Sequence, residues 1–480
     1  MSNFMTTRRD FLCTGLVGGA GALTAVSAQA EPEAMTEVDV VVVGAGASGL
    51  FAARNLVAAG KSVIVLEADD RVGGRLRQGE VMGQPVDVGG QWWGPTQDLL
   101  DGLSRELGIE RLKQNTKGKS IIRLAGHEYE YEGEIPELPE AEMIAFLAAV
   151  TTIETMAAGI DPISPWDSPD AEALDAMTAE TWIHQNVENE FIAAFIRFTV
   201  LGVCVVEPSQ ISMLQFLFYC RSGGSFVQLI STDQGAQQEV FKGGLFQVPI
   251  KMAAELGDAV RLNTPVRAIQ QDDDGVIAKT DNGVFCGKKL IMALAPTMAS
   301  RIEITPPLPA VRDNYMQRAP MGAVIKFIAG YETPFWRDMG YTGQVFTEGD
   351  ANVFFEHALN DSGKFGLAGF IDGKHVIKWA DKTQEERRDF VIKSLVNAFG
   401  EAAKNFADYT DQAWSADQWR RGGYGTQVTP GTWTTVGKAW QETNGHIHWA
   451  GTDSAEVWNG YVEGALFSGK RAAEQILSVL

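Results

Sequence analysis

Residues 38–49 read VDVVVVGAGASG, a β-branched run that leads directly into a glycine-rich loop. The residues that follow predict a helix as far as Gly60, and residues 61–66 predict a second buried strand. Glycines let a backbone approach a pyrophosphate closely, and the N-terminus of a helix offers unpaired N–H groups to it. The stretch therefore predicts a Rossmann-type unit that binds a dinucleotide through its loop, at Gly44, Gly46, Ser48 and Gly49.

Acidic and double-glycine segments follow this unit closely. Glu67 ends the second predicted strand, where a carboxylate accepts hydrogen bonds from ribose hydroxyls and repels a 2′-phosphate. The segments RVGGR (71–75) and DVGGQW (87–92) come next. Paired glycines admit a flat or anionic group, and Arg71 and Arg75 can neutralise a pyrophosphate. An unphosphorylated dinucleotide is thereby favoured.

The predicted nucleotide-binding layer is interrupted along the chain. Residues 136–235 have mostly helical periodicity and predict a helical cap. Strands return at 260–269 and 276–280, joined through a DDDG turn that is typical of a hairpin, and again at 290–296. Near the end of the chain, a strand at residues 446–451 precedes a long helix. We therefore expect two interleaved domains.

The whole sequence has 480 residues, of which 45% are hydrophobic and 21% charged, the range of ordinary globular proteins. Its 40 basic and 61 acidic residues give a formal charge of −21, which argues against binding to nucleic acid or to an anionic membrane surface. Such a charge attracts cationic small molecules weakly, although it also serves solubility.

The first thirty residues are typical of an export signal. Residues 7–12 read TRRDFL, a twin-arginine signature; an apolar stretch, 16–28, follows, and AQA at 28–30 is a cleavage site. Later in the chain no apolar run reaches the roughly 20 residues of a membrane span, since Arg197 interrupts residues 191–206. The sequence thus predicts a bacterial protein exported to the periplasm, without a membrane anchor once residues 1–30 are removed.

Several spaced motifs occur in an order that resembles the flavin monoamine oxidase family, from about residue 38 to the C-terminus. They are the glycine loop with Glu67, RVGGR (71–75), GGQWWGPTQ (89–97), PMGAVIK (320–326), AGTD (450–453) and NGYVEGA (459–465). The resemblance implies a mixed α/β fold of the amine-oxidase and p-hydroxybenzoate-hydroxylase type. Its FAD-binding domain would comprise residues 38–112, 236–315 and 416–480, and its substrate domain, with the helical cap, residues 113–235 and 316–415.

The resemblance also implies roles for residues around FAD. Glu67 would bind the adenosine ribose, Arg75 the pyrophosphate, Val266 the adenine through its backbone, and Asp453 the ribityl or pyrophosphate side. The remaining cofactor contacts would come from Gly90, Gln91, Trp92 and Val462. Many relatives bind the flavin covalently through a cysteine after a double glycine, and RGGYGT (421–426) has none there. The FAD is therefore expected to be non-covalent.

The catalytic residues implied by the resemblance surround the flavin ring. Lys326 would hold a water against flavin N5, and Tyr461 with Trp458 would form an aromatic slot for the amine. Tyr424 is the candidate for the second wall, although its segment looks one residue short. An alkylamine must lose its proton at a cost of about 4 to 5 kcal/mol at neutral pH, so a slot without acidic groups is expected. Residues expected at the substrate are Leu229, Ile230 and Gln237.

The implied reaction is oxidative deamination of a primary or secondary amine, with hydride transfer from its α-carbon to flavin N5. Water hydrolyses the imine to an aldehyde or ketone, and O2 becomes H2O2. The alternatives are a periplasmic amine dehydrogenase with a cytochrome acceptor, an L-amino-acid oxidase, a desaturase, and a flavin-binding protein without turnover. An amino-acid oxidase needs a cavity arginine, for which only Arg197 and Arg221 are candidates.

Metal binding and oligomerisation have little support in the sequence. Three cysteines outside the signal segment lack CxxC spacing, and the six histidines lack ligand spacing, so no metal site is expected. The oligomeric state stays open, a homodimer included.

Overall fold

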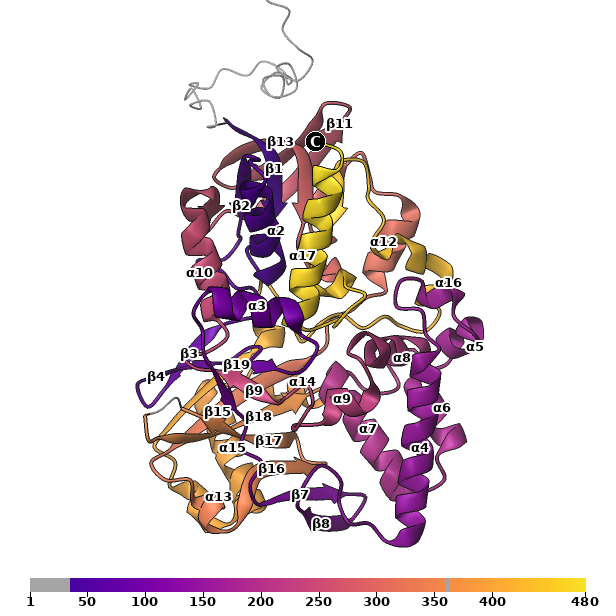
Figure 1. The fold of residues 1–480 in the computed structure, drawn as a ribbon, viewed down its shortest axis with the longest axis vertical. Helices are drawn as coiled ribbons and strands as arrows, with labels where there is room; N and C mark the ends of the chain where they lie inside the picture. The colour runs from indigo at the N-terminus through magenta and orange to yellow at the C-terminus, as the bar shows by residue number, and fades with distance from the viewer. Residues whose placement is uncertain (1–34, 360–361) are drawn as a thin grey trace, which may run out of the picture.

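The computed structural model describes residues 35–359 and 362–480, so the expected signal segment, residues 1–30, lies outside the described residues. Along its longest axis the molecule has two parts (Figure 1). One part is built on an eight-stranded sheet and holds the C-terminus; the other combines a seven-stranded sheet with a group of helices.

The eight-stranded sheet has β1 (Met35–Val43) near its centre, parallel to both β2 (Val63–Leu66) and β13 (Gly283–Met292). Its strand order is β10-β2-β1-β13-β12-β11-β14, with β20 also beside β13. The other members are β10 (Val260–Arg261), β11 (Val266–Asp272), β12 (Gly275–Thr280), β14 (Glu303–Thr305) and β20 (Ile447–Trp449). The predicted hairpin is confirmed as β11 and β12. Three distant stretches of chain share this sheet, which confirms the interrupted Rossmann-type layer.

Both faces of the eight-stranded sheet are covered, which explains the continuous valine run of β1. Val40 and Val42 pack on one face beneath the helices, while Val41 and Val43 pack on the other. The first face carries α2 (Ala47–Ala58), α3 (Asp98–Glu106), α10 (Gln247–Leu256) and α17 (Val462–Leu477); the second carries α11 (Pro296–Ala299) and α12 (Ala310–Gln317).

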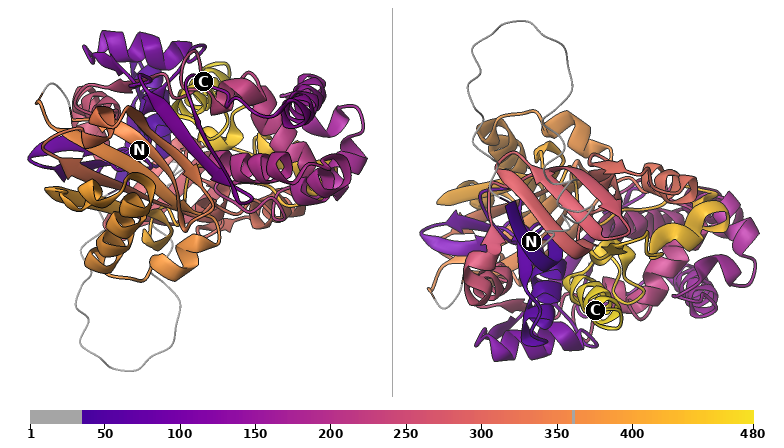
Figure 2. Two further views of the ribbon diagram at one scale, coloured as in Figure 1. Left: turned by 90° about the horizontal axis from the view of Figure 1, so that it is seen from below. Right: turned by 90° about the horizontal axis from the view of Figure 1, so that it is seen from above.

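The seven-stranded sheet has the order β19-β15-β18-β17-β16-β7-β8. In the view from below it lies beside the group of helices that shares its part of the molecule (Figure 2). Ile325, Phe327 and Ala329 of β15 pack outward against helices, so Val324 and Lys326 face the interior of the molecule. The strands are β7 (Lys119–Leu124), β8 (His127–Tyr131), β15 (Val324–Tyr331), β16 (Tyr341–Thr347), β17 (Ala351–Ala358), β18 (Phe365–Asp372) and β19 (Asp408–Ala413); the helices are α13 (Phe335–Asp338), α14 (His375–Trp379) and α15 (Gln384–Phe399).

Two small sheets complete the strands, β3 (Gln78–Val81) with β4 (Gln84–Asp87), and β5 (Trp92–Trp93) with β9 (Glu239–Phe241) and β6 (Arg111–Lys113).

The predicted helical cap is confirmed and lies at the lower right of Figure 1. Among the described residues, α4 is the one helix long and apolar enough to cross a membrane, by length and composition alone. Its Phe146 and Ile153 are buried in the core of the cap, and its Glu154 accepts hydrogen bonds from the first N–H groups of α9. The helices are α4 (Glu140–Ala158), α5 (Ala171–Ala176), α6 (Ala179–Asn186), α7 (Glu190–Cys204), α8 (Met213–Ser222), α9 (Phe226–Ile230) and α16 (Thr432–Val436).

Candidate active site

A long cavity of about 510 Å³ connects the glycine loop to the helical cap. Its first part is lined by Gly44, Gly46 and Glu67, and its far part by apolar residues such as Phe146 and Leu147. Between them the wall comes from the inner face of the seven-stranded sheet. One space thus joins a nucleotide-binding element to an apolar chamber.

Close packing explains two glycines of the loop. Gly44 has φ +102°, and a Cβ there would lie 2.9 Å from the carbonyl oxygen of Ala293. A Cβ on Gly49 would lie 2.0 Å from the carbonyl oxygen of Gly44, so the loop closes on itself only if Gly49 has no side chain. Gly49 does not line the cavity, and its role is therefore to shape the loop.

Gly46 and Ser48 differ from these glycines. A Cβ on Gly46 would meet no heavy atom nearer than 4.0 Å, and Gly46 lines the cavity at the start of α2. Ser48 also lines the cavity, but its hydroxyl accepts a hydrogen bond from the Gly451 N–H at 2.9 Å and lies 3.1 Å from Ser468 Oγ. The Ser48 side chain therefore joins α2 to α17, and only its backbone can approach a ligand.

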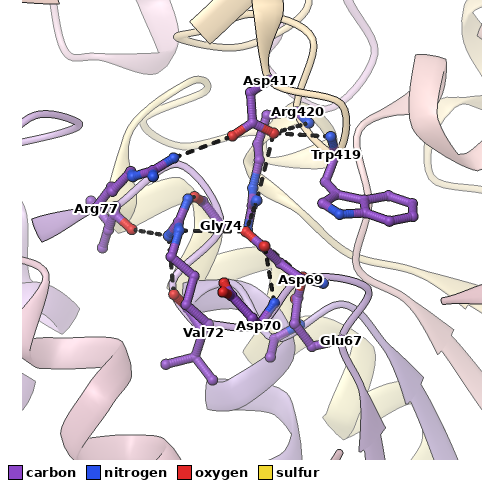
Figure 3. Close-up of polar contacts among 12 residues, drawn as sticks. Glu67, Asp69, Asp70, Val72, Gly74, Arg77, Asp417, Trp419 and Arg420 are labelled. Atoms are coloured by element: carbon purple, nitrogen blue, oxygen red, sulfur yellow. Dashed lines mark hydrogen bonds and ion pairs between the residues drawn. The ribbon is translucent and has the colours of Figure 1, made fainter. Parts of the chain in front are cut away.

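At the nucleotide end, Glu67 is held within a cluster of charged groups (Figure 3). Its carboxylate accepts hydrogen bonds from the N–H groups of Ala45, at 2.7 Å, and Asp69, at 3.0 Å. Burial raises the pKa of Glu67, whereas the charge of Arg420 lowers it. Arg420 contacts Asp69 and lies 3.7 Å from Glu67 and 3.6 Å from Asp417.

Sequence reasoning missed Arg420. Its side chain is only 6% exposed, it lines the cavity, and its Nη2 atom has no hydrogen-bond acceptor among residues 35–359 and 362–480. An N–H group buried without an acceptor costs about 1–3 kcal/mol, so a ligand that supplies one is favoured here. The sequence signal for Arg420 is a second arginine directly before RGGYGT.

Arg75 joins three distant segments beside the glycine loop. Its guanidinium donates to the Tyr424 carbonyl and to Asp453 Oδ2, both at 2.6 Å, and Asp453 also accepts from the Thr426 N–H at 2.7 Å. Burial raises the pKa of Asp453, but Arg75 and Thr426 outweigh that effect and hold the pKa below its usual value. The Asp453 side chain is only 2% exposed and does not line the cavity. Asp453 positions Arg75, which does line the cavity, and its own expected contact with the cofactor stays a prediction.

Lys326 projects from β15 into the middle of the cavity. Its side chain is 2% exposed, and its ammonium donates to the Gly89 carbonyl at 2.9 Å and to Gln91 Oε1. Burial lowers the pKa of Lys326 to about 7, although Asp87 raises it. Lys326 Nζ also lies 5.9 Å from the centre of the Trp92 ring. The predicted residues Gly90, Gln91 and Trp92 all line the cavity here.

Three polar atoms of the cavity wall, two of them beside Lys326, are buried without a hydrogen-bond partner in the described part of the chain. They are Gln91 Nε2, Trp92 Nε1 and Gln237 Oε1, and all three residues line the cavity. Buried polar groups are nearly always paired in folded proteins. A flat ring whose edge carries both acceptors and donors would satisfy them, so this wall fits the expected flavin. Val462, the first residue of α17, lines the same region.

Of the three aromatic residues expected beside the amine, the two tyrosines line the chamber and the tryptophan does not. Tyr424 and Tyr461 both border the cavity, and Tyr424 packs edge-on against Phe370 at 5.9 Å between ring centres. Trp458 is buried behind Tyr461, edge-on at 4.8 Å, and its indole N–H donates to Thr96 at 3.2 Å. Trp458 does not line the cavity. Trp458 therefore supports Tyr461, and its own contact with an amine stays a prediction.

The expected contact of Val266 with adenine stays a prediction. Val266 lies in β11 opposite Thr280 and does not line the cavity, so its expected contact with adenine has no support from the cavity wall.

On the substrate side, the predicted residues Leu229, Ile230 and Gln237 line the chamber, and Gln237 Nε2 donates to the Leu229 carbonyl at 3.0 Å. Apolar rings from α7, β16 and β17 complete this wall. The buried carboxyl of Asp372 also lines the cavity, while the expected absence of acidic groups from the aromatic slot itself stays a prediction.

A Rossmann-type layer, a glycine loop with a buried acid, and a buried lysine in one cavity are typical of a dinucleotide-dependent oxidoreductase. Residues 47–477 match the family model described as flavin containing amine oxidoreductase. The chain belongs to this family of flavin-containing amine oxidases, whose members bind FAD.

Several similar proteins span nearly the whole chain. The L-amino acid dehydrogenase of Synechocystis sp. is 36% identical over 92% of this chain and 95% of its own length. The flavin-containing amine oxidase B of Sus scrofa is 36% identical over 93% of this chain and 87% of its own length. The structure of a putrescine oxidase bound to putrescine superposes with a TM-score of 0.88 at 30% identity, and covers 93% of this chain and 100% of that one.

Proposed function

We propose that this protein oxidises a primary or secondary amine to an imine with non-covalently bound FAD and reduces O2 to H2O2. FAD, when bound, supplies the acceptor for the hydride of the amine α-carbon. The observation that carries the proposal is the buried Lys326 beside unpaired polar groups, in the same cavity as the two tyrosines.

Residues at different places along the cavity have different proposed roles. At the nucleotide end, Glu67 suits a ribose, while Arg75 and the start of α2 suit a pyrophosphate. Tyr424 and Tyr461 offer ring faces that orient an amine and stabilise its cation on entry. Because the pKa of Lys326 is about 7, its amine can hold or release a proton close to neutral pH.

Oxidation of an amino acid has less support from the cavity than oxidation of an amine. Its substrate carboxylate would need a cation in the chamber, yet neither Arg197 nor Arg221 lines the cavity, and Arg197 pairs with Glu180 at 2.8 Å. Within residues 35–359 and 362–480, the basic residues that line it are Arg75, Lys326 and Arg420, all in the nucleotide end or the polar middle.

The choice of electron acceptor has a specific alternative. Because the Synechocystis relative is a dehydrogenase, transfer to a cytochrome is the second candidate function. Comparing the rate at which O2 and a cytochrome reoxidise the reduced enzyme separates the two. Reoxidation by cytochrome alone would exclude an oxidase.

The test of the main proposal is an anaerobic panel of arylalkyl amines, aliphatic amines, polyamines and L-amino acids, scored by loss of oxidised-flavin absorbance. We expect amines to bleach the flavin and amino acids to leave it oxidised; the opposite result would exclude the proposal. Acid precipitation should release the flavin into the supernatant, because RGGYGT carries no cysteine for a covalent bond. Flavin that stays with the pellet would contradict non-covalent binding.

We also propose export to the periplasm by the twin-arginine route, which the sequence of residues 7–30 supports. Replacing Arg8 and Arg9 by lysine should retain the protein in the cytoplasm, as measured by cell fractionation.

A further inference from the structure

Asp372 is the last residue of β18 and faces the same side of the sheet as Lys326. In the antiparallel pairing of β15 with β18, Lys326 lies opposite Phe370 and Val324 lies opposite Asp372. Opposed residues share a face of a sheet, as do residues two apart. Asp372 is fully buried from solvent, and it lines the cavity together with Phe370 and Tyr424.

The Asp372 carboxyl is only partly satisfied by the protein. Its Oδ1 atom accepts a hydrogen bond from Asn352 Nδ2 at 2.5 Å, while its Oδ2 atom has no partner in residues 35–359 and 362–480. No described basic residue pairs with the Asp372 carboxyl. The negative charge of Glu207 repels a charge on that carboxyl and so raises its pKa. A buried carboxylate without a cation is costly, so this position favours a ligand that brings a positive charge.

We propose that Asp372 binds the distal ammonium of a diamine or polyamine substrate and so determines the specificity of the chamber. The inference rests on the proposed amine oxidation. An ammonium donates three hydrogen bonds, and one suffices for the free Oδ2 atom. Residues two apart on a strand are about 7 Å apart, so Asp372 lies within reach of a short carbon chain held beside Phe370 and Tyr424.

The rest of the wall supports a cationic substrate. Among the described residues, three acidic ones line the cavity, and one of them, Glu67, belongs to the nucleotide end. Glu134 accepts backbone hydrogen bonds from Thr232 and Asp233 and lies beside Ile135, which is 47% exposed at the outer end. A dication therefore meets an acid at the entrance and a second one inside an otherwise apolar chamber. Burial raises the pKa of Asp372 to about 7, and a bound ammonium would lower it again.

The test compares α,ω-diamines of increasing length with n-alkylamines of equal length in anaerobic flavin reduction, using the purified holoenzyme. The wild type should reduce faster with the best diamine than with the matching monoamine, by at least about tenfold in second-order rate constant. Asp372→Asn keeps the shape and should lower the diamine rate constant about 100-fold, while changing the monoamine value less than about threefold. Asp372→Glu should move the optimum to a shorter diamine.

Two controls separate a specific contact of Asp372 with the ammonium from general electrostatic attraction and from loss of FAD. Glu134→Gln at the entrance should reduce the diamine rate constant only modestly and mainly at low salt. Flavin absorbance per protein reports whether each variant still holds FAD. An equal loss for diamines and monoamines in Asp372→Asn, or no preference for diamines in the wild type, would overturn the inference while leaving the proposed function intact. If no amine reduces the wild-type flavin, the proposed function fails, and the inference fails with it.

Discussion

Replacing Gly46 by alanine should weaken cofactor binding strongly while leaving the apoprotein folded. Gly46 has φ −75° and ψ 177°, a conformation open to any residue, and an added Cβ would lie 4.0 Å from the nearest heavy atom, the Cα of Gly74. The methyl group would instead occupy the cavity at the first turn of α2, where a pyrophosphate is expected.

The size of the effect follows from the hydrogen bonds at risk. Displacing the phosphate from two backbone N–H groups removes two bonds to a charged group, each about 1.5–3 kcal/mol. The sum of about 3–6 kcal/mol corresponds to a rise in the Kd for FAD of roughly 10² to 10⁴-fold. Fluorescence titration of the apoprotein with FAD measures the Kd, and circular dichroism measures the melting temperature, which should stay within about 2 °C of wild type.

Gly49→Ala is the matched control. Its Cβ would lie 2.0 Å from the Gly44 carbonyl oxygen, so it should disrupt the loop and lower the melting temperature of the apoprotein itself. Wild-type affinity for FAD in Gly46→Ala would refute the assignment of this loop to the cofactor. A loss of stability in Gly46→Ala equal to that in Gly49→Ala would refute the argument from open space.

Other predictions concern the charged residues of the cavity. Lys326→Met should slow reoxidation of the flavin by O2 at least about tenfold but leave its reduction by amine almost unchanged, because reduction does not need the ammonium; equal slowing of both half-reactions, measured by stopped flow, would contradict this role. Between about pH 7 and 10.5 only the unfolded chain keeps the Lys326 proton, so the apoprotein's free energy of unfolding should rise with pH there, and less so in Lys326→Met, as urea titrations would show. Asp453→Asn should cost about 1–3 kcal/mol, measured by urea unfolding, and weaken FAD binding, because Arg75 loses its anion. Arg420→Leu should raise the Kd for FAD about tenfold without changing the flavin-reduction rate at saturating amine, whereas an unchanged Kd would show that its free N–H does not meet the cofactor.

Local sequence determined much of the fold. The valines of β1, the glycine loop and α2 follow from short-range rules, since strand periodicity, turn chemistry and helix limits depend on neighbouring residues. Motif order then identified the family, because several spaced segments must meet at one cofactor. Lys326 was found in this way: it stands in a strand whose apolar neighbours exclude an ordinary surface position.

Tertiary structure alone decided which side chains reach the cavity. Asp453 and Trp458 lie in the expected motifs, yet they support Arg75 and Tyr461 from behind, because the direction of a side chain depends on the packing of distant segments. Asp372 lies in the segment FIDG (370–373), whose sequence is typical of an ordinary turn. Only the pairing of β18 with β15 brings its carboxyl to the chamber. The sequence by itself therefore determined the fold and the cofactor, while the chemistry offered to the substrate came from contacts between residues far apart in the chain.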